Sequence, residues 1–302
     1  MHVLTSPCRS YRMAALTSTL VLLACGGCAN PPAEEIEISA AARPQYEVVF
    51  SGTVGDAQEL FGMSISGDDR HRLTTLSGFA DFPVWSPSGS RILFLAMADE
   101  TSNLLVMDAA TGEISGVVTE NGNPADWGPD GERILITAGI DGGGRGLFIV
   151  DLDGGDKERV DTGSSEDAYA RWSPAGDALT YESGRDGNPE IYWTSLETGE
   201  TRRLTDNQIL DEWPSFSPDG SHIAWASGGE EDKNLWIMRA DGSEKRQVTR
   251  DMMFGDAFPE WSPDGRQILL TVRRSEEFVL ELIDLETGNA THLGAGTAPS
   301  WR

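Results

Sequence analysis

One short motif recurs along this chain at a nearly constant spacing, and this repeat limits the possible folds more than any other feature. Each copy places an aromatic residue before a Ser-Pro or Gly-Pro pair, a glycine turn and an apolar run, as in "PEWSPDGRQILLTV" at 259–272. A repeat of about 40–45 residues is typical of proteins in which every repeat forms one supersecondary unit. Successive aromatic anchors lie 42, 45, 44, 45 and 40 residues apart. The anchors are Trp85, Trp127, Trp172, Phe216, Trp261 and Trp301.

Each repeat has the pattern of four short strands. The anchor strand ends at proline, and the following glycine accepts the positive φ that a tight turn requires. An apolar strand such as "RILFLA" at 91–96 then returns, and a third strand such as "EIYWTSLETGE" at 190–200 ends in another glycine turn. The fourth strand is clearest in "RRLT" at 202–205. Four antiparallel strands in each repeat predict the blade of a β-propeller.

The number of blades follows from the two chain ends. Five complete units begin at the anchors from Trp85 to Trp261, and residues 46–77 match a second, third and fourth strand without a first. The C-terminal "TAPSWR" at 297–302 supplies the missing strand. The sequence therefore predicts an all-β, six-bladed β-propeller over 46–302, with the C-terminal strand joining the N-terminal blade. Ring closure leaves no free sheet edge, which favours a monomer.

The N-terminal 24 residues have the features of an export signal. Arg9 and Arg12 precede the apolar run at 13–24, which is too short to span a bilayer as a helix. Leu22 to Cys25 resembles the bacterial lipobox, so we expect a lipoprotein signal peptide at 1–24 and lipidation of Cys25. The alternative is an ordinary cleaved signal in which the cysteine stands by chance.

The segment at 25–45 is expected to be a flexible tether that follows the lipidated cysteine. It is rich in Pro, Ala and Glu and lacks apolar periodicity. Gly26 and Gly27 provide no inner-membrane retention aspartate, which favours the periplasmic face of the outer membrane or the cell surface. The sequence thus predicts an exported protein of the cell envelope.

Charge excludes one large class of partner. The chain carries a net charge of −26, and loss of Arg9 and Arg12 with the signal would leave −28. Such a field repels nucleic-acid phosphates, so no nucleic acid is expected as a partner. The composition also offers no basic patch for anionic lipid, which leaves the acyl chain as the only predicted membrane contact.

Acidic residues recur shortly before several anchors. In a propeller this segment enters the innermost strand at one mouth of the central channel, so the carboxylates could converge there. Converging acids would favour a cation such as Ca²⁺ or a basic partner segment. The alternative is that they start turns or cap strands and face water. The channel-mouth candidates are Asp81, Asp167, Asp211, Glu212 and Asp256.

A second set of candidates stands one residue before an anchor, where a side chain can face the channel itself. These channel-side candidates are Asp126, Arg171 and Glu260. A cluster of such groups at one mouth would support a small-molecule or glycan site, or an enzyme that uses the channel.

The sequence lacks the constellations of a catalytic propeller, so we expect no enzyme. It has no G-x-S-x-G nucleophile elbow, and its histidines outside the signal fall in different repeats. They are His71, His222 and His292. A histidine-rich metal site is therefore not supported.

The repeats resemble the WD40-like, or PD40, repeats of the TolB-like β-propeller family. The match is fullest in "YARWSPAGDALTYESGRDGNPEIYWTSLETGETRRLT" at 169–205, and the resemblance runs from about residue 46 to the end. It implies a binding or scaffolding module with envelope proteins as partners, such as peptidoglycan-associated or outer-membrane proteins. TolB has a further α/β domain before its propeller, and residues 26–45 cannot hold one, which argues against a place in the Tol machinery itself.

Overall fold

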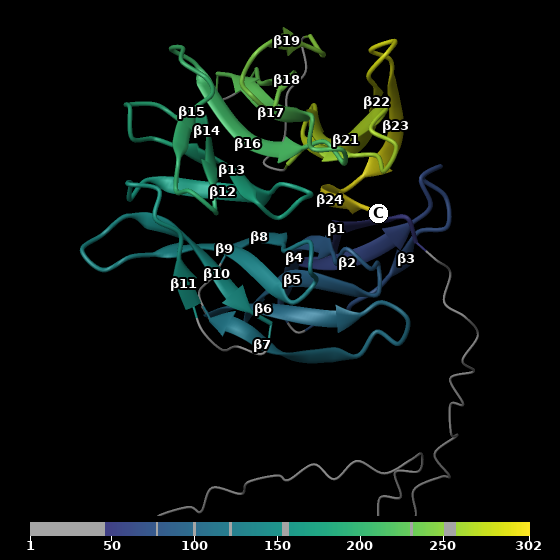
Figure 1. Ribbon diagram of the computed structural model, residues 1–302. Coiled ribbons are helices and arrows are strands. Elements are labelled where there is room, and N and C mark those ends of the chain that lie inside the picture. Colours follow the sequence, from purple (N-terminus) through teal and green to yellow (C-terminus); the bar gives the residue numbers. More distant parts are fainter. Residues whose placement is uncertain are drawn as a thin grey trace, which may run out of the picture. The chain divides into compact units, whose positions relative to one another are not determined.

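The computed structural model describes residues 46–302 apart from 77, 99–100, 121–122, 153–156, 230–231 and 251–257. The predicted signal peptide at 1–24 and the tether at 25–45, with Cys25, lie outside the described residues. The described part forms 24 strands in six four-stranded antiparallel sheets, which are the blades of a propeller (Figure 1). It contains no helix that is long and apolar enough to span a membrane. The predicted fold class is confirmed.

Blades 1 to 3 each contain four strands, as the repeats predict. Blade 1 consists of β24 (Thr297–Trp301), β1 (Val48–Val54), β2 (Ala57–Met63) and β3 (His71–Arg72). Blade 2 consists of β4 (Phe79–Trp85), β5 (Arg91–Ala98), β6 (Thr101–Asp108) and β7 (Ile114–Glu120). Blade 3 consists of β8 (Asn123–Trp127), β9 (Arg133–Gly139), β10 (Arg145–Asp151) and β11 (Lys157–Arg159).

The remaining three blades repeat the same order. Blade 4 consists of β12 (Asp167–Trp172), β13 (Ala178–Ser183), β14 (Glu190–Ser195) and β15 (Thr201–Arg203). Blade 5 consists of β16 (Leu210–Phe216), β17 (His222–Gly228), β18 (Asn234–Arg239) and β19 (Arg246–Gln247). Blade 6 consists of β20 (Glu260–Trp261), β21 (Gln267–Arg274), β22 (Glu277–Asp284) and β23 (Ala290–Ala295).

The first strands of the six blades form a closed inner ring. Each contacts the first strand of the next blade, from β4 through β8, β12, β16 and β20 to β24, and β24 contacts β4. The C-terminal β24 pairs antiparallel with β1, with Val48 opposite Trp301, and lies beside it in Figure 1. The Arg302 guanidinium fastens this closure by donating to Tyr46 O at 2.8 Å and to Gly89 O at 2.7 Å.

The aromatic anchors fill the space between adjacent blades, as their size and regular position predict. Trp127 of blade 3 is buried against Val84 and Leu93 of blade 2, and its indole Nε1 donates to Val84 O at 3.0 Å. Trp172 packs in the same way against Leu135 of blade 3. The anchors are therefore core residues that hold neighbouring sheets together.

The strand order defines two faces of the propeller. The turns between the first and second strands, and between the third and fourth, lie on one face, which we call the turn face. The hairpins between the second and third strands, and the links from one blade to the next, lie on the other, which we call the loop face. On the turn face the glycines after the Ser-Pro or Gly-Pro pairs have φ between 66° and 75°, as their turns require. They are Gly89, Gly131, Gly176, Gly220 and Gly265.

Candidate functional site

The first strands that line the central channel share an irregularity near the loop face. The pairing of the first strand with the second shifts by a β-bulge or irregularity between Asp81 and Val84 in blade 2, and similar shifts occur in blades 1, 3, 4 and 5. A non-glycine residue with φ between 45° and 52° lies at the shifts of blades 1, 2, 4 and 5. These bulge residues are Phe82, Tyr169, Trp213 and Ala298. Bulges re-aim side chains and are common beside functional sites.

Side chains from the preceding blade accept hydrogen bonds from three of these four bulge residues. The amide of Tyr169 donates to Thr137 Oγ1 at 3.3 Å, and that of Ala298 donates to Thr271 Oγ1 at 3.0 Å. At Trp213 the acceptor is the carboxylate of Glu182, at 3.3 Å. All three acceptors stand ten residues after an anchor. Glu182 is thus an ionisable residue at a position where two other repeats use threonine.

Glu182 belongs to a buried charged group that the sequence patterns did not reveal. Burial, followed by the nearby Glu212 carboxylate, raises the pKa of Glu182 to about 8. Lys233 Nζ lies 2.5 Å from Glu212 Oε2 and 4.4 Å from the centre of the Trp213 ring. The signal that could have revealed Glu182 is its charge, because the other four complete repeats have Leu, Thr, Ala and Thr at this position.

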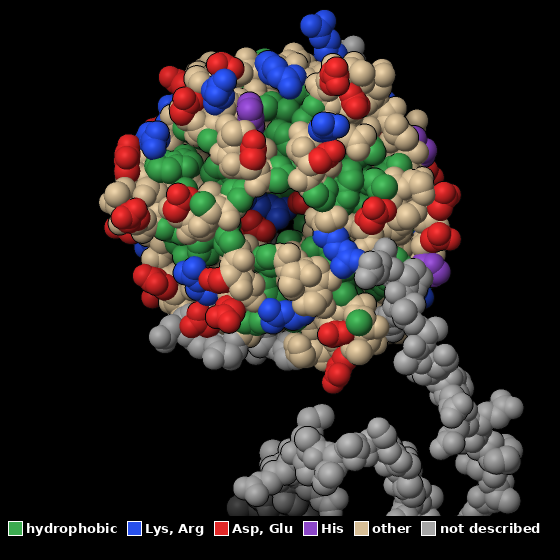
Figure 2. Space-filling view, turned by 45° about the vertical axis from the view of Figure 1, so that its right-hand side comes forward, with side chains coloured by type: hydrophobic (Ala, Val, Ile, Leu, Met, Phe, Trp, Pro, Cys, Tyr) green, Lys and Arg blue, Asp and Glu red, His purple; other side chains and the backbone are tan. Residues whose placement is uncertain are grey.

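The three channel-side candidates converge into one charged cluster, which we call the channel triad. Arg171 Nη2 lies 2.6 Å from Glu260 Oε1, and Arg171 Nη1 lies 3.3 Å from Asp126 Oδ1. These residues come from blades 3, 4 and 6. Because blades 4 and 6 are not neighbours, the ion pairs connect separate parts of the inner ring. Figure 2 shows a central hollow with charged side chains of both signs at its floor.

The channel triad is desolvated and rigidly held. Its side chains are only 9% (Arg171), 18% (Asp126) and 14% (Glu260) exposed. Burial raises the pKa of Asp126 and raises that of Glu260 to about 7, although Arg171 opposes both shifts. Asp126 also accepts from the amides of Trp127 at 2.9 Å and Trp172 at 3.0 Å. The triad joins the first strands of three blades at the channel.

An aromatic cluster lies next to the channel triad. The ring of Tyr169 meets Trp213 edge-on at 6.4 Å and Phe258 at 6.1 Å between centroids. The Arg171 guanidinium lies 3.9 Å from the centre of the Phe258 ring, within the range of a cation–π contact. Trp213 and Phe258 are 6% and 7% exposed, so the cluster contributes mainly packing between blades.

The channel-mouth candidates do not share one set of contacts. Asp167 is buried and accepts from Arg185 Nη2 at 2.9 Å and from the Thr162 hydroxyl. Asp211 is also buried, and it accepts from Trp225 Nε1 at 3.0 Å and Asn207 Nδ2 at 2.7 Å. These two aspartates brace their own blades and do not face water. A ligand-binding role for them stays a prediction.

Glu212 and Asp81, the other channel-mouth candidates that the structure describes, make contacts of two further kinds. Glu212 pairs with Lys233 in blade 5, whereas Asp81 accepts from the amide of Phe82 at 2.8 Å and faces blade 1. Asp256 lies outside the described residues. Among the residues that the structure describes, no group of three His, Cys, Asp or Glu side chains is placed to hold a metal ion. The described acids therefore do not assemble a Ca²⁺ site.

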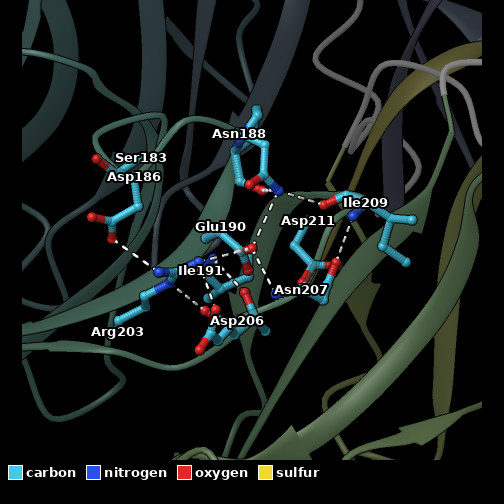
Figure 3. A network of polar contacts seen from close by, with 12 residues as sticks. Ser183, Asp186, Asn188, Glu190, Ile191, Arg203, Asp206, Asn207, Ile209 and Asp211 are labelled. Atoms are coloured by element: carbon cyan, nitrogen blue, oxygen red, sulfur yellow. Dashed lines mark hydrogen bonds and ion pairs between the residues drawn. The ribbon is translucent and has the colours of Figure 1, made fainter.

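A polar network on the loop face of blade 4 was also not predicted (Figure 3). The buried Glu190 carboxylate accepts from Arg203 Nη2 at 3.1 Å, from Asn188 Nδ2 at 3.2 Å and from the amide of Asn207 at 2.9 Å. Blade 1 has an equivalent brace, in which Glu59 accepts from Arg72 Nη2 at 2.7 Å. A glutamate at or near the start of the third strand and an arginine in the fourth form the detectable signal. Its recurrence indicates a structural role within the blade.

Proteins of similar sequence include TolB homologues. A TolB homologue from Chlorobium chlorochromatii is 30% identical over 139 residues, which cover 46% of this chain and 31% of the homologue. An uncharacterized protein, Atu1656, from Agrobacterium fabrum is 28% identical over 240 residues, 72% of this chain and 80% of that protein. The alignments with the curated TolB homologues thus span about a third of their length.

Solved structures share the fold. The crystal structure of TolB from Acinetobacter baumannii superposes with a TM-score of 0.75 at 22% identity, covering 84% of this chain and 66% of that one. Enzymes share it as well: an oligogalacturonate lyase in complex with manganese gives a TM-score of 0.57 at 15% identity, covering 82% and 74%. The TolB beta propeller domain family matches residues 82–301. The chain belongs to the TolB β-propeller (PD40) domain family.

Proposed function

We propose that this chain is a non-enzymatic binding module of the cell envelope, which is tethered through lipidated Cys25 and presents the loop face of its propeller to a protein partner. The observation that carries the proposal is the distribution of exposed apolar side chains. Among the described residues six large hydrophobic side chains are exposed, and five of them lie on the loop face. These five are Val54, Phe79, Met97, Ile209 and Phe278. Clustered exposed apolar residues are typical of protein-binding surfaces.

The exposed residues are concentrated on three consecutive blades. Val54 ends the second strand of blade 1, Phe79 and Met97 are paired neighbours in blade 2, and Phe278 follows the hairpin of blade 6. Ile209 stands in the link that leads to blade 5. Charged residues such as Glu276 and Glu277 adjoin Phe278, as is common at non-obligate interfaces. The resemblance to TolB supports a protein partner of the envelope, such as a peptidoglycan-associated or outer-membrane protein.

Ile114 gives a matched control, because it is the one exposed large hydrophobic residue of the described part that lies on the turn face. It is 37% exposed, compared with 44% for Met97 in the same blade. We expect in-cell crosslinking and affinity purification to recover a defined envelope protein with the wild type and with Ile114→Glu. Met97→Glu and Phe278→Glu should lose it while remaining folded. Equal recovery with all three variants would contradict the use of the loop face.

The predicted anchor can be tested independently of the partner. Wild-type protein should incorporate labelled palmitate and sediment with membranes, whereas Cys25→Ser should do neither. Cys28→Ser is the control, since this cysteine lies three residues further on and is not the expected lipidation site. Labelling that persists in Cys25→Ser would show that the anchor was assigned wrongly.

A further inference from the structure

A cavity of about 660 Å³ opens on the loop face where blades 1, 2 and 6 meet, and we call it the seam cavity. The ring closes here, because β24 at the end of the chain lies between β1 and β4. Residues of β1, β2, β4, the hairpin between β21 and β22, and the link before β24 line it. Its volume lies within the range of roughly 300–1,000 Å³ that is usual for ligand sites.

Four phenyl rings line the seam cavity. Phe50 and Phe61 are stacked with ring centroids 5.6 Å apart and an interplanar angle of 22°. Phe82 contributes from the bulge of blade 2, and the exposed Phe278 contributes from blade 6. Because the face of an aromatic ring carries negative electrostatic potential, such walls favour apolar groups and organic cations.

The charges that line the seam cavity are mainly acidic. Asp81, Glu276 and Glu277 stand against one cation, Arg70. The Arg70 guanidinium donates to the carbonyls of Ala295 and Leu293, both at 2.7 Å, and lies 4.9 Å from the centre of the Phe50 ring. Two of its donors thus bind the backbone of blade 6, and the lining has an excess of two negative charges.

Asp81 has no cationic partner among the described residues, as is also true of Asp211, but of these two acids only Asp81 lines the seam cavity. Within the described part of the chain, no Lys or Arg nitrogen lies within 4.0 Å of its carboxylate, whereas Asp126 and Asp167 both have an arginine there. Burial raises the pKa of Asp81, and nearby polar groups, among them the Phe82 amide that donates to its carboxylate, only partly oppose this shift. A desolvated carboxylate without a countercharge is unfavourable, and a bound cation would relieve that cost.

We infer that the seam cavity receives a basic side chain, lysine or arginine, of a protein partner, with its charge against Asp81 and its aliphatic stem against the phenyl rings. This inference rests on the proposed function, since it identifies the part of the loop face that anchors the partner. Phe79, Met97 and Phe278 are exposed beside the cavity and suit the apolar residues that flank such an anchor. The strongly negative net charge of −26 steers a basic segment toward this protein.

Short peptides test the chemistry directly. Acetyl-Gly-Lys-Gly-amide and acetyl-Gly-Arg-Gly-amide should bind the full chain in detergent, as detected by ligand-observed NMR, and the norleucine analogue should bind at least about tenfold more weakly. Asp81→Asn should weaken the binding of the basic peptides by about tenfold or more, because it removes the countercharge and keeps an acceptor for the Phe82 amide. Glu277→Gln, at an exposed position, should weaken the binding of the basic peptides to a smaller extent.

Asp141→Asn is the matched control, because it removes one exposed acid on the loop face of blade 3, away from the cavity. It should leave peptide binding unchanged. Binding that is equal for the basic and norleucine peptides, or that does not respond to Asp81→Asn, would overturn the inference. Binding of free spermidine that is tighter than that of the peptides would overturn it as well, since a diffusible cation would then be the occupant.

The inference and the proposed function fail in different ways. If the wild type recovers no envelope protein, the proposed function fails. If the wild type recovers a partner that Met97→Glu loses but Asp81→Asn keeps, the loop face is used and the seam cavity is not its anchor.

Discussion

At the scale of single residues, the acids of the inner ring are distinguished by their partners. Asp167 and Asp126 have arginines, Glu182 has another carboxylate nearby, and Asp81 has none of the described cations. The charges that surround these acids differ from one acid to the next. The electrostatics of this ring must therefore be considered residue by residue.

Glu182 should make stability depend on pH. The folded state holds its proton up to a pKa of about 8, compared with 4.5 for an ordinary glutamate. Between these values the folded state binds more protons than the unfolded state, so the free energy of unfolding falls as pH rises. Glu260, with a pKa of about 7, adds to this decrease in the free energy of unfolding over a narrower pH range. Thermal unfolding should show a lower Tm at pH 8.5 than at pH 5.

Glu182→Gln should reduce this dependence and raise the Tm at pH 8.5, since the neutral amide carries no burial penalty for charge. The exposed Glu113→Gln should retain the wild-type profile. An unchanged slope in Glu182→Gln would show that Glu182 does not hold its proton in the folded state.

Arg171 should stabilise the ring through the channel triad. Arg171→Leu leaves Asp126 and Glu260 buried without their cation, which should cost about 3–5 kcal/mol of unfolding free energy in urea titrations. Arg239→Leu is the control, because its pair with Glu244 is solvent-exposed and should contribute only about 0–1 kcal/mol. Adding Asp126→Asn and Glu260→Gln to Arg171→Leu should recover most of the loss. Similar small losses for Arg171→Leu and Arg239→Leu would contradict this account.

At the scale of elements, β24 has the largest individual role because it completes blade 1 and closes the ring. Deletion of residues 296–302 should expose the edge of β1 and the part of blade 6 that packs against β24, and it should lower the Tm markedly. Removal of Arg302 alone should have a smaller effect, since it loses three hydrogen bonds and a contact with Trp85 but keeps the strand. Thermal unfolding monitored by tryptophan fluorescence would measure both. An unchanged Tm in the longer deletion would contradict closure by β24.

The sequence was sufficient to predict the blades because anchors, turns and apolar strands repeat at one period. The same period predicted β24, since the C-terminal "TAPSWR" matches a first strand and residues 46–77 lack one. The bulges were not predicted, because a positive φ at Tyr169 or Trp213 has no residue signature comparable to glycine. Their aromatic side chains would ordinarily argue against that conformation.

At the scale of the whole molecule, the candidate sites depend on which blades meet. The channel triad could be proposed residue by residue, since its members share a place before an anchor, but the pairing of Arg171 with Glu260 depends on the ring. The seam cavity could not be predicted, because Phe50 and Phe278 are separated by most of the chain. Similarly, the partners of Asp167 and Asp211 depend on side-chain directions that one repeated aspartate does not specify.

The central claim is that the loop face over blades 6, 1 and 2 binds a protein partner in the cell envelope. The most direct test is a photoreactive amino acid placed singly at Val54, Met97, Phe278 or Ile114 in living cells, followed by irradiation and mass spectrometry of the adducts. The account predicts adducts of one envelope protein from the first three positions and none from Ile114 on the turn face. Adducts from Ile114 alone, or no adduct from any loop-face position, would contradict it.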